Sequence, residues 1–166
     1  MAILNVLEFP DPILKKVCKP VTVFDKNLEV FVEDLKDTIL SHNYCVGLAA
    51  PQTGSLQRII LIDVSRARKP VPGKNLLVLI NPEIIEFSDF KIVREGCLSI
   101  PDFTANVKRA MKIKVNYQDI KGENKSLETV DFEAHAIQHE LDHLDGILFL
   151  DRITSPASDL FRRLQR

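Results

Sequence analysis

The sequence predicts an α+β domain in which antiparallel β-sheets pack around a central helix carrying the pattern His-Glu-x-x-His. Two observations carry this prediction. Apolar residues recur at helical spacing near the start and near the end of the chain, and short runs rich in β-branched residues lie between them. Because one helix precedes the strands and the other follows them, the order of the elements favours an α+β arrangement.

The first helix is expected directly after Asp25. Leu28, Phe31, Leu35 and Ile39 follow the three- and four-residue spacing that places side chains on one face of a helix. The Asp25 carboxylate can accept a hydrogen bond from a free N–H of the first turn, as an N-cap does. The sequence therefore predicts an N-terminal helix with one face in the core.

Three short segments have the composition of strands: residues 57–64, 76–82 and 109–119. The first two are continuous apolar runs. The third alternates apolar with polar residues, which is the two-residue period of a half-buried strand. Its apolar members are Met111, Ile113, Val115 and Tyr117.

The second helix is expected from about Asp131, where the first turn is acidic, to Gly146, a residue suited to the position just after a helix. An α-helix turns about 100° per residue, so His139 and His143 lie one above the other with Glu140 beside them. Two imidazoles in this relation can share a divalent ion, and the carboxylate can act as a base on a metal-bound water.

The same histidine spacing also arises by chance on a solvated helix face, which the acidic neighbours Asp142 and Asp145 would suit. The glutamate between the two histidines favours the metal site, because a zinc-hydrolase pattern requires it at that place.

A third ligand is therefore sought. No glutamate follows Glu140, and Phe149 stands where a further histidine of this kind of motif would lie. His135 is separated from His143 by about 12 Å of helix rise, too far to share one ion with it. A carboxylate or a thiolate upstream remains, and Cys97 is the candidate at the end of a strand-like run.

The chain has three cysteines, Cys18, Cys45 and Cys97, with no Cys-x-x-Cys pair. An odd number of cysteines argues against a disulfide framework. A lone cysteine is most often a small buried hydrophobe, which we expect for Cys18 and Cys45. Spacing alone prefers Cys97 over Cys45 as the ligand only slightly.

Composition limits the possible functions. A length of 166 residues with 45% hydrophobic residues predicts a single domain spanning residues 1–166. A formal net charge of −1 gives no case for direct nucleic-acid recognition. No apolar run approaches the roughly 18 residues that span a bilayer, so no membrane association is expected. The start of the chain does not resemble a signal peptide, which predicts a cytoplasmic protein, with an organellar origin left open.

Three segments resemble the signature motifs of the bacterial peptide deformylases: residues 47–54 (GLAAPQTG), 95–101 (EGCLSIP) and 138–146 (QHELDHLDG). Their order along the chain is also that of the family. The likeness extends to "LEFPDPILKKVCKPV", "NPEI" and "ILFLDRI", so it covers most of the chain.

The resemblance implies a role for particular residues. The metal ligands would be Cys97, His139 and His143, and the catalytic residues would be Glu140 as general base and acid, with Gln52 and the backbone N–H of Leu98 holding the oxyanion. The substrate cleft would be shaped by Gly47, Val46, Glu95 and His135.

The resemblance also implies the reaction and its partners. The expected activity is hydrolytic removal of the formyl group from N-formylmethionyl nascent peptides, with release of formate. The expected cofactor is one divalent metal ion, Fe²⁺ in the cell, although Zn²⁺, Ni²⁺ or Co²⁺ also suit thiolate and imidazole. A basic C-terminal helix in residues 157–166 could contact the ribosome, as in related deformylases.

Other functions remain open at this point. One is a metallopeptidase or another N-acyl amide hydrolase, suggested by the histidine helix. Another is a non-catalytic peptide-binding module, although binding alone does not require a complete hydrolytic set.

Two residues depart from the family pattern. Cys45 occupies a position that is usually glycine, and a positive φ there would strain cysteine by about 1–2 kcal/mol. It would also place a second thiol near the metal, which could favour oxidation. His135 stands where relatives carry an apolar residue of the methionine pocket. It predicts either a more polar pocket or a partly exposed, hydrogen-bonded helix histidine.

Overall fold

The computed structural model describes residues 2–164. The helices are α1 (Lys26–Leu40), α2 (Asp131–Leu144) and the short α3 (Pro156–Asp159), with single 3-10 turns at η1 (Pro12–Lys15), η2 (Ala50–Thr53), η3 (Val64–Arg66) and η4 (Phe149–Asp151). The strands are β1 (Gly47–Ala49), β2 (Ile59–Ile62), β3 (Leu77–Cys97), β4 (Ile100–Gln118), β5 (Asn124–Val130) and β6 (Leu160–Arg162).

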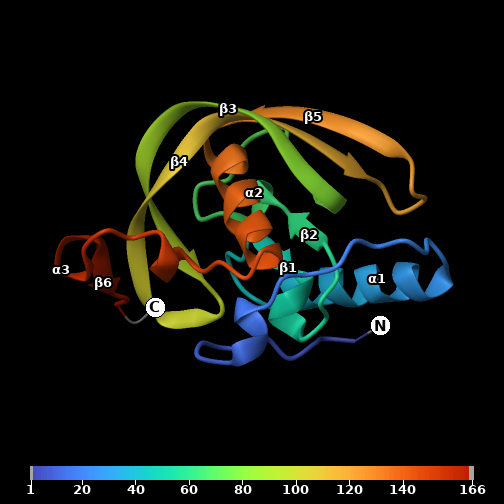
Figure 1. Cartoon of the computed structure of the whole chain (residues 1–166), viewed down its shortest axis with the longest axis horizontal. Helices are drawn as coiled ribbons and strands as arrows, with labels where there is room; N and C mark the ends of the chain where they lie inside the picture. The colour runs from blue at the N-terminus through green and yellow to red at the C-terminus, as the bar shows by residue number, and fades with distance from the viewer. Residues whose placement is uncertain (1, 165–166) are drawn as a thin grey trace.

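The six strands form one antiparallel sheet in the order β1-β2-β3-β4-β5, with β6 paired to β4. The long hairpin of β3 and β4 curves over α2 and encloses it from one side (Figure 1). The predicted α+β fold, with antiparallel strands around the His-Glu-x-x-His helix, is confirmed. The strands belong to a single sheet instead of several, because the long hairpin connects the two ends of the sheet.

Strand β2 is buried on both faces, which explains its continuous apolar sequence. Ile60 and Ile62 pack in the cluster that contains α2, whereas Ile59 and Leu61 pack with α1. Successive side chains of a strand point to opposite faces, so every residue of this run meets a core. Strand β2 therefore separates two apolar layers, one on each side.

Helix α1 agrees with the prediction. Its N-cap is Asp25, whose Oδ1 accepts a hydrogen bond from the N–H of Leu28 at 3.0 Å. The apolar face buries Leu35 and Ile39 completely against β1 and β2, while Phe31 is half-buried at the edge.

Helix α2 begins and ends where the sequence predicts, and Gly146 after it has φ +71°. It is buried on nearly every side, including the carboxylates of Glu133, Glu140 and Asp142, because the sheet covers it from several directions. Buried polar groups require hydrogen-bond partners, so the polar motif on α2 must be paired within the fold.

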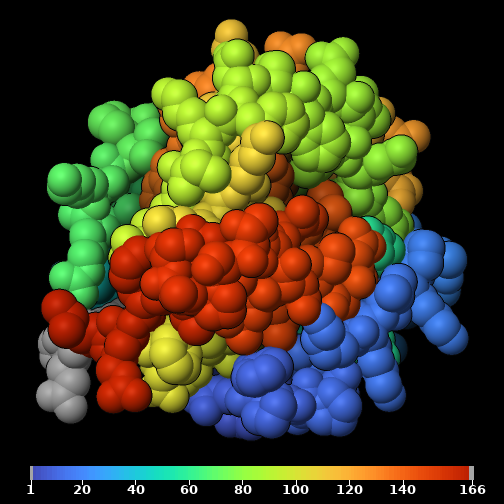
Figure 2. Space-filling view, turned by 60° about the vertical axis from the view of Figure 1, so that its left-hand side comes forward, coloured from blue at the N-terminus to red at the C-terminus, as the bar shows by residue number. Residues whose placement is uncertain are grey.

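The C-terminal segment differs from the expectation. A short helix is present, but α3 ends at Asp159, and the next three residues form β6, in which Phe161 pairs with Thr104 of β4. Leu160 packs into an apolar cluster under this strand, which favours pairing over a continued helix. Figure 2 shows this part of the chain (red) lying against the β3–β4 hairpin. The predicted short C-terminal helix is therefore confirmed, but it ends before Arg162 and Arg163, and Arg166 lies outside the described residues.

No helix within the described residues is long and apolar enough to cross a membrane.

Candidate active site

Three of the predicted site residues meet at one point. Cys97 ends β3, and His139 and His143 lie one turn apart on α2. Their possible ligand atoms all lie within 4.8 Å of one another, and the Cys97 sulfur is 3.3 Å from Nε2 of His143. All three side chains are buried. A thiolate and two imidazoles at this separation can hold a single metal ion.

Glu95 fixes the orientation of His139. Its Oε1 lies 2.7 Å from Nδ1 of the imidazole. Because the carboxylate accepts the Nδ1 proton, the lone pair of Nε2 is left for a metal, which is the usual second contact of a ligating histidine. The charge of Glu95 raises the pKa of His139 although burial opposes this. Burial and the nearby His139 instead lower the pKa of His143.

Glu95 is itself held by a buried ion-pair network. Arg109 of β4 donates from Nε to Oε2 at 2.6 Å and from Nη2 to Oε1 at 2.8 Å. The same guanidinium donates from Nη1 to Asp142 of α2 at 2.7 Å, and Asp142 also accepts from Arg152. Burial opposes the charge of Glu95, but hydrogen bonds from Arg109 and the histidines hold its pKa far below the usual range. The network therefore ties β3, β4 and α2 together around His139.

The sequence reasoning missed Arg109, although a signal was present. Met111, Ile113 and Val115 face the core at alternate positions of β4, and Arg109 has the same parity. A cation on the inward face of an alternating strand requires a buried counter-charge.

Glu140 lies beside the three candidate ligands. Its Oε1 is 3.9 Å from Nε2 of His139, and its Oε2 is buried without a hydrogen-bond partner in residues 2–164. Burial raises the pKa of this carboxyl to about 7. An unpaired buried oxygen next to a possible metal position fits a group that receives a proton from a bound water.

Gln52 is buried within hydrogen-bonding distance of two groups on the β3–β4 turn. Its Nε2 lies 3.1 Å from Oγ of Ser99 and 3.6 Å from the Cys97 sulfur, and its Oε1 accepts from the N–H of Ala49 at 2.9 Å. Leu98 follows Cys97 in that turn and lines the same cavity. The structure therefore brings the two predicted oxyanion donors to the same side of the site.

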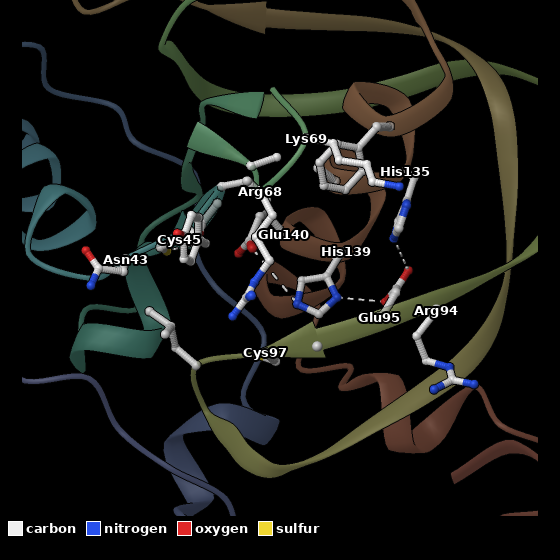
Figure 3. A pocket seen from close by; sticks show the side chains of 18 of the residues that line it. Asn43, Cys45, Arg68, Lys69, Arg94, Glu95, Cys97, His135, His139 and Glu140 are labelled. Carbon is white, nitrogen blue, oxygen red and sulfur yellow. Dashed lines mark hydrogen bonds and ion pairs between the residues drawn. The ribbon is translucent and has the colours of Figure 1, made fainter. Parts of the chain in front are cut away.

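A cavity of about 560 Å³ opens in front of these residues (Figure 3). Its lining includes nine of the ten predicted site residues, all except His143; the nine are Val46, Gly47, Gln52, Glu95, Cys97, Leu98, His135, His139 and Glu140. It also includes cationic residues that the sequence reasoning did not assign to the site.

His135 agrees with both predictions made for it, a polar pocket residue and a hydrogen-bonded helix histidine. It is 9% exposed and lines the cavity, and its Nε2 lies 3.1 Å from Oε2 of Glu95. Its ring also meets Phe132 edge-on, with the ring centroids 5.5 Å apart. The side chain is therefore a hydrogen-bonded helix histidine and a polar part of the wall at once.

The strain that a positive φ would cause at Cys45 is absent, because the positive φ of 58° falls on Tyr44 one residue earlier. The Cys45 thiol donates to the carbonyl of Gly47 at 3.2 Å. Burial raises the pKa of this thiol to about 12, which argues against a reactive thiolate beside the site. The other cysteine expected to be a buried hydrophobe, Cys18, packs in the core around α2.

Comparisons with known proteins agree with this geometry. The family model described as polypeptide deformylase matches residues 3–159. The peptide deformylase of Desulfotalea psychrophila is 44% identical over 163 residues, which cover 98% of this chain and 95% of that protein.

Two solved structures are similar in fold as well as in sequence. The peptide deformylase from Thermotoga maritima has 39% identity and a TM-score of 0.85, with 93% of this chain and 100% of that one covered. The class I type b peptide deformylase from Acinetobacter baumannii has 38% identity and a TM-score of 0.86, with 92% and 100% covered. With near-complete coverage in sequence and fold, this chain belongs to the polypeptide deformylase family.

Proposed function

We propose that this protein removes the formyl group from N-formylmethionine at the start of newly made proteins, and that residues 1–166 form one catalytic domain. The observation that carries the proposal is the meeting of Cys97, His139 and His143 beside the unpartnered Oε2 of Glu140, at the wall of an open cavity. Binding a peptide alone would not require this combination.

The donor set fits one divalent metal ion held by Cys97, His139 and His143. Such an ion supplies a bound water of lowered pKa and polarises the formyl carbonyl. We propose Fe²⁺ as the ion in the cell, although thiolate and imidazole also accept Zn²⁺, Ni²⁺ or Co²⁺. Metal analysis of anaerobically purified protein tests this: a predominance of zinc together with inactivity of the ferrous form would overturn it.

The protein's own groups would move the proton and stabilise the charge. Glu140 takes a proton from the attacking water at its Oε2 and returns it to the departing amine. Gln52 Nε2 and the Leu98 N–H donate to the oxygen that becomes negative as water adds to the formyl carbon. Loss of one such donor typically costs about 2.7–4 kcal/mol of transition-state stabilisation.

The remaining cleft residues would position the peptide. Gly47 lies on β1 and Val46 just before it, and both line the cavity together with His135 and Glu95. We assign these four residues to the substrate site. The protein would act in the cytoplasm on chains leaving the ribosome. Ribosome contact by the C-terminal residues is a further part of this proposal, and co-sedimentation unaffected by removing residues 158–166 would contradict it.

The experiment is formate release from N-formyl-Met-Ala-Ser by anaerobically purified, ferrous-loaded protein. Glu140→Ala should abolish the release, while Glu128→Ala on the exposed face of β5 serves as a matched control and should leave it intact. Free amino acids in place of formate would indicate a peptidase. A folded, metal-bearing sample that releases neither product would overturn the proposal.

A further inference from the structure

Positively charged side chains gather around the opening of the cavity. Arg68 and Lys69 follow η3, Arg94 lies on β3, and Arg163 follows β6. We call these four residues the cationic rim; the first three are labelled in Figure 3, where Arg94 lies across the pocket from Arg68. They come from three distant parts of a chain whose formal net charge is −1, so their meeting here is not a consequence of composition.

The cationic rim does not serve to neutralise the acidic residues of the cavity. Glu95 and Glu140 are the carboxylates among the lining residues, and both are buried deep in the wall. Glu95 is already paired with Arg109 from inside the fold. Within residues 2–164, no carboxylate forms an ion pair with Arg68, Lys69 or Arg94, so their charge is available at the opening.

Two of the rim side chains are held in place. Arg94 donates from Nε to Oδ1 of Asn106 at 3.0 Å, and its guanidinium carbon lies 3.6 Å from the ring centroid of Phe161. The guanidinium of Arg68 lies 4.6 Å from the ring centroid of Tyr44. A held side chain loses less conformational freedom on binding a ligand, so the rim is partly preorganised for an anion.

We propose that the cationic rim selects formylated peptides that carry an aspartate or glutamate at the second or third residue. This inference rests on the proposed function and names a substrate class for the same site. A peptide whose first residue enters the cavity must leave past the rim, within reach of its charges. The rim lines the catalytic cavity itself instead of an outer face, which favours a peptide carboxylate over nucleic acid as the anion.

The test compares C-terminally amidated peptides that differ only in charge. The first pair is formyl-Met-Asp-Ser and formyl-Met-Asn-Ser, and the second carries Asp or Asn at the third residue. We expect kcat/KM for the aspartate peptide to exceed that for the asparagine peptide by about three- to tenfold at low salt in at least one pair. The ratio should fall as salt is raised, because exposed charges are screened.

Variants locate the effect. Arg94→Gln and Lys69→Gln should bring the aspartate-to-asparagine ratio close to one. Lys112→Gln removes an exposed cation of β4 that lies outside the cavity, and it should leave the ratio unchanged. A ratio of one or less in the unmodified protein, or a ratio that the rim variants do not change, would overturn the inference.

A binding measurement separates this inference from the proposed activity. If no formylated peptide is hydrolysed, the proposed function fails. Calorimetry with amidated Met-Asp-Ser and Met-Asn-Ser then still tests whether the cationic rim prefers the peptide that carries aspartate. Tighter binding of the aspartate peptide that Arg94→Gln abolishes would support it, and equal binding would refute it. Rim variants that weaken ribosome co-sedimentation but leave the peptide ratio unchanged would assign the charges to RNA and also refute it.

Discussion

Gly47 touches Glu140 so closely that the smallest possible side chain should disturb catalysis. A Cβ built on Gly47 would lie 2.6 Å from Oε1, 2.8 Å from Cγ and 3.0 Å from Cδ of Glu140. Ordinary contacts of a Cβ begin near 3.4 Å. Gly47→Ala therefore requires the carboxylate, the backbone of β1, or both to move by roughly 0.8 Å.

The structure leaves little room for this movement. Glu140 is 5% exposed and is fixed on a helix buried on nearly all sides, while the residue after Gly47 is fully buried in the core. Overpacking of this kind costs about 1–3 kcal/mol of stability. Misplacing a catalytic group by about 1 Å can cost roughly 10²-fold in rate. We expect kcat for formate release to fall about 100-fold, with a much smaller change in KM.

The assay is steady-state formate release at measured metal content, with thermal unfolding in parallel. Gly96→Ala is the matched control, because a Cβ there would meet the flexible end of Arg163, 1.9 Å away, instead of a buried group. It should retain most of the activity. Full activity of Gly47→Ala with unchanged metal content would refute the reasoning, since Glu140 would then tolerate displacement or would not be the base.

Three other predictions follow from the same contacts. Glu95→Gln keeps the shape of the side chain but removes the negative charge that pairs with the buried Arg109. We therefore expect the free energy of unfolding in urea to fall by about 3–5 kcal/mol, and metal binding measured by titration to weaken by about 10–100-fold. Normal metal affinity would contradict the role given to the contact between Glu95 and His139. His135→Ile replaces a polar wall by an apolar one, so the kcat/KM ratio of formyl-Met-Ala-Ser to formyl-Gln-Ala-Ser should rise by about tenfold, and an unchanged ratio would remove His135 from the methionine pocket. Burial raises the pKa of Cys45 to about 12, so its thiol stays protonated at pH 8 and should resist iodoacetamide in the native protein. Rapid labelling at this residue would show that the site opens.

The elements that the sequence predicted are those packed against the core. Helices α1 and α2 and strand β2 carry continuous or periodic apolar patterns, because each of them meets buried neighbours. Most of β3 was not predicted. Residues 85–92 are exposed on both faces of the curved hairpin, so no alternation marks them as a strand. Strand β5 is also mostly exposed, and its pairing with β4 is what identifies it as a strand.

The site could be predicted only in part, because its residues come from segments that are far apart in the sequence. The helical period alone placed His139, Glu140 and His143 together, but Cys97 lies 42 residues before the first of them, and only the family resemblance selected it over Cys45. A positive φ was considered for Cys45, but it belongs to Tyr44, one residue earlier. Such a shift depends on how the loop meets β2, which no local pattern records.

The spacing of Glu95 and Cys97 shows why a strand and a helix are both needed here. The two residues lie two apart on β3, so their side chains point to the same face, and both are buried toward α2. The exposed Gly96 between them faces Arg163 on the other side. The carboxylate that orients His139 and the sulfur beside His143 are therefore set by one strand, while the two imidazoles are set by one helix. A single-residue insertion between Glu95 and Cys97 would turn one of the two side chains away from α2. The site would then lose either the candidate metal ligand Cys97 or the carboxylate that orients His139.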